Sequence, residues 1–322
     1  MPRLKRTIAI VTMATGMAFS SPNAAQATDW EPNEALEPCF TSDGTDEGVA
    51  AALAKCRELL GSARYGGEDA AMLRYAIINF ESRTLTVDEQ VERLTSLTRD
   101  SLPVNYRYQR DALLAGICYD AKKWACVVDA IRPNLQSTYL AMNELTMFAE
   151  GLTETQGVTA VETLGTELIQ QDAQSAVGYL LRADARKQGG DKAGAASDLV
   201  KAGALMRSEY ADGQNHVCWR LVTELGAADK ARDACDAAVL ASPLSWVVWD
   251  SHGAMNLALG ENGKAWQSYE MAVRLDEKAA SALYGRGLAW ERFGNPEKAQ
   301  EDKAAALAID PNIAKDYEGY GI

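Results

Sequence analysis

The sequence predicts an all-α solenoid, that is, a stack of helical hairpins, and two observations carry this prediction. First, Gly226, Gly260 and Gly294 lie 34 residues apart. A period of about 34 residues is one helix-turn-helix unit, and such a unit must stack on its copies to bury its apolar face. Second, the chain is rich in alanine, only 7% aromatic, and poor in β-branched runs, which favours helix. Two alanine positions share the glycine period: Ala231, Ala265 and Ala299, and Ala238, Ala272 and Ala306.

Residues 1–27 are expected to be a secretory signal peptide and not part of the fold. A basic start is followed by an apolar stretch over residues 7–19, which is too short to span a membrane. The small residues Ala25 and Ala27 then provide a cleavage site, so the mature chain should begin near Thr28 in the periplasm or outside the cell. The alternative is a disordered or membrane-anchoring tail. No later stretch is apolar enough to span a membrane.

The charge of the chain argues against nucleic acid as a partner. The full chain has 32 basic and 45 acidic residues, and its formal net charge is −13. Removal of residues 1–27 takes away three basic residues and no acidic ones, which leaves a still more acidic protein. Binding to phosphate requires a basic face, whereas an acidic surface favours solubility and, weakly, basic partners.

The mature chain divides into three predicted parts. Residues 28–48 contain turn signals and are expected to form an extended segment. Residues 49–175 are expected to form degenerate helical hairpins, after a capping helix over residues 49–60. Residues 176–322 are expected to contain the regular repeats and a C-terminal cap.

The degenerate part still shows helical pairs. These pairs are expected at 70–80 with 87–97, 106–119 with 124–131, and 139–152 with 158–169. Thr86 and Glu89 have the spacing of a capping box at the start of the second helix. With four repeats in the regular part, the chain should contain about seven hairpins.

The regular repeats are clearest over residues 245–276 and 280–311. The second of these begins its second helix at Asn295-Pro296-Glu297, which supplies an N-cap, proline at the first helical position and an acid in the first turn. A third repeat precedes them at 226–243, and a fourth, at 179–202, fits after a shift of two residues.

These residues resemble the tetratricopeptide repeat (TPR) family. Trp249, Gly253, Gly260, Ala265 and Tyr269 match the family pattern in type and spacing. The chain departs from that pattern at position 252, where histidine replaces leucine, and at position 256, where asparagine replaces tyrosine. The resemblance covers residues 176–311 and implies a protein-binding solenoid similar to exported bacterial TPR proteins.

The six cysteines are expected to form three local disulfides. Cys218 and Cys235 are equidistant from the turn at Gly226-Ala227, and facing positions in a helical hairpin approach to about 4–6 Å, which suits a disulfide. The same symmetry pairs Cys118 with Cys126, and Cys39 then ties the entry segment to Cys56. The alternative is that the cysteines are small buried residues. A metal site is not expected, because the chain has no CxxC and only two histidines.

No motif of an enzyme is present, and we expect neither catalytic residues nor a cofactor. His216 and His252 each stand alone on a helix without an assigned partner. Asp198, Asp236 and Asp302 take comparable positions on the second helices and are expected at the surface.

In the TPR family the first helices of the hairpins line a concave groove, and the resemblance implies a binding site there. The candidate residues are Tyr179, Asp184, His216, Arg220, Asp250, Tyr284, Leu288 and Arg292. They mix charge and apolar area, and they lack the set of side chains with which chaperone-binding relatives hold a carboxylate.

The sequence therefore predicts an exported, non-catalytic TPR scaffold or adaptor for a protein or peptide partner in the bacterial periplasm or envelope. The alternative is an accessory or substrate-positioning subunit of an envelope enzyme system. A third possibility is a redox-responsive module that uses Cys118 and Cys126.

Overall fold

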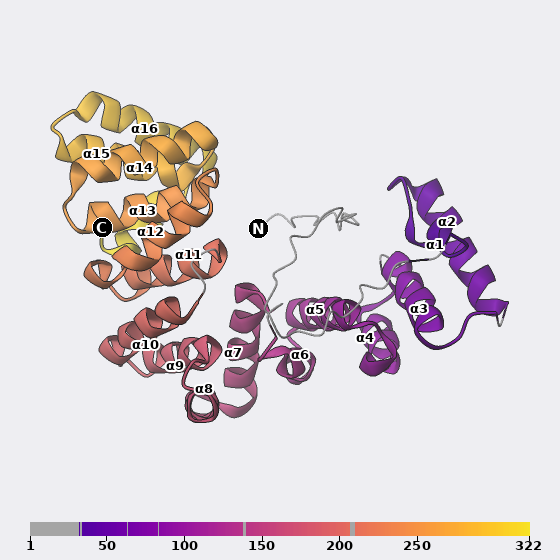
Figure 1. The fold of residues 1–322 in the computed structure, drawn as a ribbon. Helices are drawn as coiled ribbons and strands as arrows, with labels where there is room; N and C mark the ends of the chain where they lie inside the picture. The colour runs from indigo at the N-terminus through magenta and orange to yellow at the C-terminus, as the bar shows by residue number, and fades with distance from the viewer. Residues whose placement is uncertain (1–31, 33, 63, 83, 138–139, 207–209) are drawn as a thin grey trace. The chain divides into compact units, whose positions relative to one another are not determined.

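The computed structural model describes residues 32, 34–62, 64–82, 84–137, 140–206 and 210–322. The expected signal peptide and the expected mature start at Thr28 lie outside these residues. Within the described ranges every regular element is a helix, as the predicted fold class requires (Figure 1). None of the helices in these ranges is long and apolar enough to cross a membrane.

The chain forms two compact units, residues 1–134 and residues 135–322. In unit 1 the helices α3 and α4 make one hairpin and α5 and α6 make another, with α2 packed against α3. The bounds are α1 Glu37–Phe40, α2 Asp46–Gly61, α3 Gly67–Glu81, α4 Val87–Ser96, η1 Arg99–Ser101, α5 Val104–Asp120, α6 Trp124–Ile131 and η2 Arg132–Asn134.

The start of unit 1 differs from the expectation of an extended segment followed by a helix at residue 49. The structure places the short helix α1 within residues 28–48, and α2 begins at Asp46. The earlier start has a local cause, because Thr45 Oγ1 accepts a hydrogen bond from the backbone N–H of Gly48 at 3.0 Å. The capping box that we expected at Thr86 and Glu89 is present at the start of α4.

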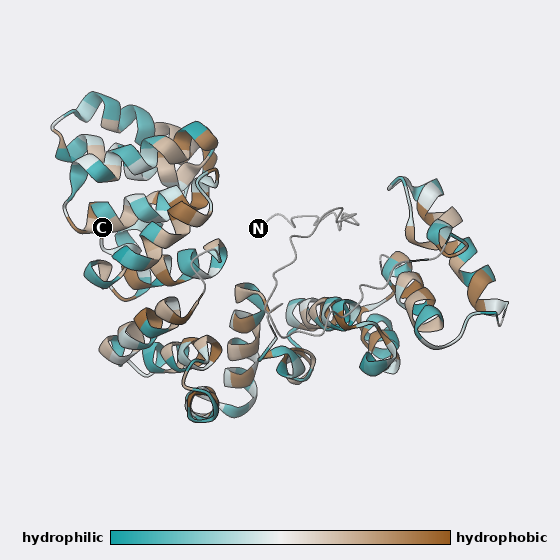
Figure 2. Ribbon diagram, viewed as in Figure 1, coloured by the Kyte–Doolittle hydropathy of each residue, from teal (hydrophilic) through white to brown (hydrophobic). Residues whose placement is uncertain are grey.

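In unit 2 the described residues form five hairpins followed by one more helix. The pairs are α7 with α8, α9 with α10, α11 with α12, α13 with α14 and α15 with α16. The bounds are α7 Met142–Gln156, α8 Val158–Gln171, α9 Ala176–Gln188, α10 Lys192–Leu205, α11 Ala211–Trp219, η3 Arg220–Glu224, η4 Ala228–Lys230, α12 Arg232–Ala241, α13 Trp246–Ala258, α14 Asn262–Leu275, α15 Ala280–Arg292, α16 Pro296–Ile309 and α17 Ile313–Tyr320. Hydrophobic and hydrophilic residues mix along these helices (Figure 2), as expected where each helix buries one side.

The 34-residue glycine period has a backbone cause. Gly226, Gly260 and Gly294 have φ angles of 63°, 74° and 73°, which is the left-handed conformation. Each follows the first helix of its hairpin, where a residue of positive φ ends the helix and glycine adopts that conformation without steric cost. Gly190, with a φ of 85°, has the same place after α9 and accounts for the two-residue shift of that repeat.

One contact between the two helices of a hairpin recurs in the last four hairpins with different chemistry. In the outer two, Arg182 and Arg286 make bidentate hydrogen bonds of 2.6–2.9 Å to an aspartate 16 residues later. In the two hairpins between them, the contact is a disulfide in one and a 2.8 Å hydrogen bond in the other. The four pairs are Arg182 with Asp198, Cys218 with Cys235, His252 with Ser268, and Arg286 with Asp302.

This recurring contact corrects two expectations from the sequence. Asp198 and Asp302 were expected at the surface, but they are only 3% and 8% exposed because each binds an arginine of the facing helix. His252 is not alone: its Nδ1 lies 2.8 Å from Ser268 Oγ and its Nε2 lies 3.0 Å from Asp236 Oδ1. Asp236 itself remains exposed, as expected.

The structure joins the cysteines in the same three pairs as the sequence analysis, 39 with 56, 118 with 126, and 218 with 235. The first connects α1 to α2, and the other two each connect the helices of one hairpin. All three bonds are therefore local, as the near-neighbour packing of a hairpin requires.

We expect non-reducing peptide mapping to recover these three pairs. Replacement of Cys218 and Cys235 together by alanine should lower the free energy of unfolding by about 2–3 kcal/mol, because the bond restricts the unfolded chain across a loop of 17 residues. Urea unfolding with and without the double substitution measures this loss. Free thiols in the oxidised protein, or a bond between different hairpins, would contradict the pairing.

Candidate functional site

The eight predicted binding residues all lie on the first helices of the last four hairpins. We call the surface of α9, α11 with η3, α13 and α15 the A face. Tyr179 and Asp184 lie on α9, His216 on α11, Arg220 on η3, Asp250 on α13, and Tyr284, Leu288 and Arg292 on α15. Five of them fall into two clusters, Asp184 and His216 around Arg220, and Tyr284 near Asp250.

The first cluster is a network of charged side chains around Arg220. This residue opens η3, a π-helical turn that continues α11, and it is only 5% exposed. Its guanidinium forms an ion pair with the carboxylate of Asp184, and its Nε donates to Glu224 Oε2 at 3.1 Å. Lys187 Nζ donates to the same Glu224 oxygen at 2.8 Å. Two cations and two carboxylates thus satisfy one another within the protein.

Burial shifts the pKa values of two groups in this cluster. It raises the pKa of Asp184, and the charge of Arg220 works in the opposite direction. Burial also lowers the pKa of His216 to about 4, with the nearby charge of Arg220 as the second cause. His216 is therefore a neutral imidazole at neutral pH, and it contributes no charge to a partner.

We expect the substitution Arg220→Met to raise the pKa of His216, because it removes the cation that disfavours imidazolium. The pKa should stay below the ordinary value of 6.5, since burial is the larger cause. NMR titration can follow each histidine because the chain has only two. His252 is the internal control, and an unchanged pKa for His216 would contradict the proximity of the two side chains.

The second cluster is covered by α17. Tyr317 lies against Tyr284 of α15 with ring centroids 5.0 Å apart, and Tyr320 lies against Trp219 of α11 at 5.1 Å. Helix α17 therefore reaches from α15 back to α11 across the A face and does not begin another stacked hairpin. Tyr284, which we predicted to face a ligand, faces a helix of its own chain.

Asp250 lies buried near the tyrosines of α17. It is 5% exposed, the Ser281 hydroxyl hydrogen-bonds to its carboxyl group, and its Oδ1 has no hydrogen-bond partner among the described residues. Burial raises the pKa of Asp250 to about 7. The Tyr317 hydroxyl donates to the Ser281 carbonyl at 2.9 Å and lies 3.2 Å from the Tyr269 hydroxyl. Carboxyl and hydroxyl groups thus gather at one buried point.

A glycine makes room for this cluster. A Cβ at Gly285 would lie 2.2 Å from Tyr269 Cζ and 2.6 Å from the Tyr317 hydroxyl. A packing role for Gly285 and a C-terminal cap were both expected from the sequence, but the position of α17 on the A face was not. One signal was present: Ile313, Tyr317 and Tyr320 are spaced as the apolar side of a helix.

The remaining predicted residues make separate contacts. The Arg182 guanidinium lies 5.5 Å from the centre of the Tyr179 ring. Leu288 packs against the hydrophobic core of the last hairpins. Arg292 is exposed, and its guanidinium donates to the backbone carbonyl of Leu257.

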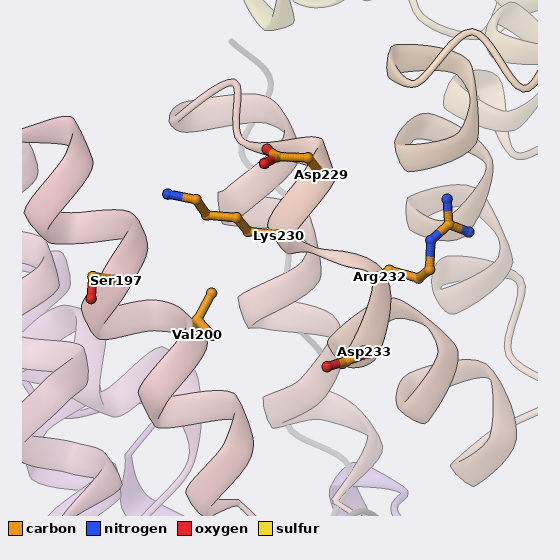
Figure 3. A pocket seen from close by; sticks show the side chains of 6 residues that line it. All are labelled: Ser197, Val200, Asp229, Lys230, Arg232 and Asp233. Carbon is orange, nitrogen blue, oxygen red and sulfur yellow. The ribbon is translucent and has the colours of Figure 1, made fainter.

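A hollow lies outside these two clusters, between α10 and the segment from η4 to α12 (Figure 3). It has a volume of about 370 Å³, and Lys230 extends across it toward α10, whereas Arg232 points away and pairs with Glu261. Its lining residues are Ser197, Val200, Asp229, Lys230, Arg232 and Asp233, none of which we predicted. In the part of the chain that the structure describes, no group of three or more His, Cys, Asp or Glu side chains could hold a metal ion.

Neither a protein-family model nor a curated protein sequence matches the chain. Its fold is similar to solved structures at low identity. MamA is 18% identical with a TM-score of 0.43, over 55% of this chain and 99% of MamA. YrrB, described as a TPR protein with an unusual peptide-binding site, is 18% identical with a TM-score of 0.43, over 61% of this chain and 98% of YrrB. The C-terminal part of a TPR repeat-containing protein from Cytophaga hutchinsonii is 16% identical with a TM-score of 0.43, over 75% of this chain and 97% of that structure. The similarity concerns the helical fold alone.

Proposed function

We propose that this protein is an exported, non-catalytic TPR scaffold or adaptor that binds a protein or peptide partner in the bacterial periplasm or envelope. The observation that carries the proposal is the packing of α17 on the A face. Two aromatic contacts and a partly buried hydrogen bond hold this helix on the A face, so the surface has the chemistry to hold a helix.

The disulfides support the proposed compartment. Three bonds among six cysteines leave no free thiol, and disulfides persist in oxidising compartments such as the periplasm. We expect mature protein from the envelope fraction to begin near Thr28. N-terminal sequencing tests this, and an intact Met1 on cytoplasmic protein would remove the argument from compartment.

Site-specific crosslinking tests the binding function. A photoreactive amino acid at Tyr179 probes a part of the A face whose described contacts do not include α17, and the same amino acid at Leu240 is the control. Leu240 is 80% exposed and lies on α12, a second helix. We expect a defined adduct from position 179 in the periplasm and none from position 240. Adducts from position 240 alone, or from neither position, would contradict binding through the A face.

A further inference from the structure

Helix α17 is held on the A face by one side only. Ile313 and Tyr317 are 5% and 2% exposed, and Tyr320 lies against Trp219. The other side of the helix is open to solvent and carries Lys315, Asp316 and Glu318. Aliphatic and aromatic residues at positions i, i+4 and i+7 are the pattern by which an amphipathic helix binds a surface.

The surface beneath α17 includes a buried carboxyl group to which α17 donates no hydrogen bond. Asp250 of α13 is buried, yet its Oδ1 has no hydrogen-bond partner in the part of the chain that the structure describes. The Tyr317 hydroxyl of α17 donates to the Ser281 carbonyl instead. A buried carboxyl without a full set of partners costs free energy that a donor or a cation would recover.

The charged side chains around the surface beneath α17 bind groups other than Asp250. On η3, Arg220 and Glu224 bind Asp184 and Lys187. On α15, the Arg292 guanidinium donates to the Leu257 carbonyl. The ionisable side chains whose pKa values are raised by burial and by the charge of Asp250 are Tyr269 of α14 and Tyr317 and Tyr320 of α17, and phenols with raised pKa values are neutral at pH 7. None of these tyrosines supplies a positive charge to the carboxyl.

The intrinsic stability of helix α17 is also low. The helix has eight residues, and isolated helices of this length are unstable in water. One of the eight is Gly319, which is exposed and weakens the helix further, and a Cβ at this position would have nothing within 4 Å. The turn before the helix, at Pro311 and Asn312, is exposed as well.

We propose that α17 is a built-in competitor, and that the A face from α11 to α15 binds a basic amphipathic helix of a partner protein, which displaces α17 and places a Lys or Arg side chain on Asp250. The inference rests on the proposed function of the A face and adds the chemistry of the partner. The net charge of −13 favours a basic partner over an acidic one.

The proposal carries a pH dependence with a definite sign. With α17 seated, burial holds the pKa of Asp250 at about 7, and a bound cation would lower it. Binding below pH 7 therefore releases a proton from Asp250. Affinity should rise with pH, by at most about tenfold per pH unit, and level off above about pH 7.

Two labelled helical peptides serve as probes. One repeats the α17 pattern with Arg in the place of Tyr317, and the other has Gln there. The protein is tested as wild type and in two variants that change α17 in opposite directions. Tyr320→Ala removes the contact with Trp219 and loosens α17, whereas Gly319→Ala strengthens the helix without a new contact. Circular dichroism establishes that all forms have the same helix content.

We expect Tyr320→Ala to bind the Arg probe about tenfold more tightly than wild type, and Gly319→Ala to bind it about fivefold more weakly. In the Tyr320→Ala background the Arg probe should bind about tenfold better than the Gln probe, and Asp250→Asn should abolish both this preference and the pH dependence. If the three forms bind the Arg probe equally well, α17 is not a competitor. If the Arg and Gln probes bind equally well, the partner does not place a basic side chain on Asp250. If no form binds a probe while crosslinking from position 179 succeeds, this inference fails and the proposed function stands.

Discussion

Gly165→Leu is expected to lower the free energy of unfolding of unit 2 by at least about 3 kcal/mol, because it forces apart two helices whose backbones touch. A Cβ at Gly165 of α8 would lie 2.7 Å from the carbonyl oxygen of Gly178 and 2.8 Å from the backbone nitrogen of Arg182, both in α9. Backbone atoms cannot rotate out of the way, so the helices must separate and lose the packing between them.

Two other substitutions of glycine by leucine serve as comparisons for Gly165→Leu. Gly263→Leu makes the same change in α14, where nothing lies within 4 Å of the new Cβ, and it should leave stability nearly unchanged. Gly253→Leu places a Cβ 2.8 Å from the Tyr269 ring, a side chain that can shift in part, so we expect an intermediate loss of about 1–3 kcal/mol. Urea unfolding monitored by tryptophan emission measures all three. Equal stability of the Gly165 and Gly263 variants would contradict the close approach of α8 and α9.

The features that could be predicted from the sequence are those with a local cause. The capping box at Thr86 and the N-cap at Asn295 involve residues within one helical turn, and both are present in the structure. The glycine at the end of each first helix is equally local, since the backbone there must adopt a positive φ. The cysteine pairs required one further step, the antiparallel packing of a hairpin, and the near symmetry of Cys218 and Cys235 about Gly226 supplied it.

The features that could not be predicted depend on contacts between hairpins or on the position of α17. The period of the repeat places Tyr284 and Asp250 on the first helices, but it does not say that α17 covers them. Helix α17 has a polar side and an apolar side like the other helices, so its pattern fits a further stacked hairpin as well as a helix on the A face. The burial of Asp198 and Asp302 was within reach, because Arg182 and Arg286 stand 16 residues earlier, the spacing of facing positions in these hairpins.

The ionisation of Asp250 should make the stability of unit 2 depend on pH. An aspartic acid has an ordinary pKa of 3.8, and burial raises the pKa of Asp250 to about 7 in the folded protein. Between these values the folded state holds a proton that the unfolded state has lost, so the free energy of unfolding falls as pH rises. The contribution of Asp250 is full below about pH 4 and is lost by about pH 7, and its size is at most about 4 kcal/mol.

His216 opposes this trend, so the wild-type profile alone does not reveal it. The pKa of His216 falls from 6.5 to about 4 on folding, and the unfolded state therefore binds the extra proton in that range. Its contribution to stability rises with pH from about 4 to 6.5, while that of Asp250 declines. The two slopes cancel in part over the same interval, and variants are needed to separate them.

Asp250→Asn should therefore stabilise the protein relative to wild type at pH 8 and have little effect at pH 4, since asparagine resembles the neutral acid and cannot ionise. Urea unfolding at intervals from pH 4 to pH 8 gives the difference between the two proteins, in which the other titrating groups cancel. His216→Gln is the matched control, and it should steepen the fall in stability with rising pH up to about 6.5, because it removes the opposing slope. A difference between Asp250→Asn and wild type that stays constant from pH 4 to pH 8 would mean that Asp250 keeps its ordinary pKa in the folded protein. It would also remove the reason to expect an unpaired carboxyl under α17.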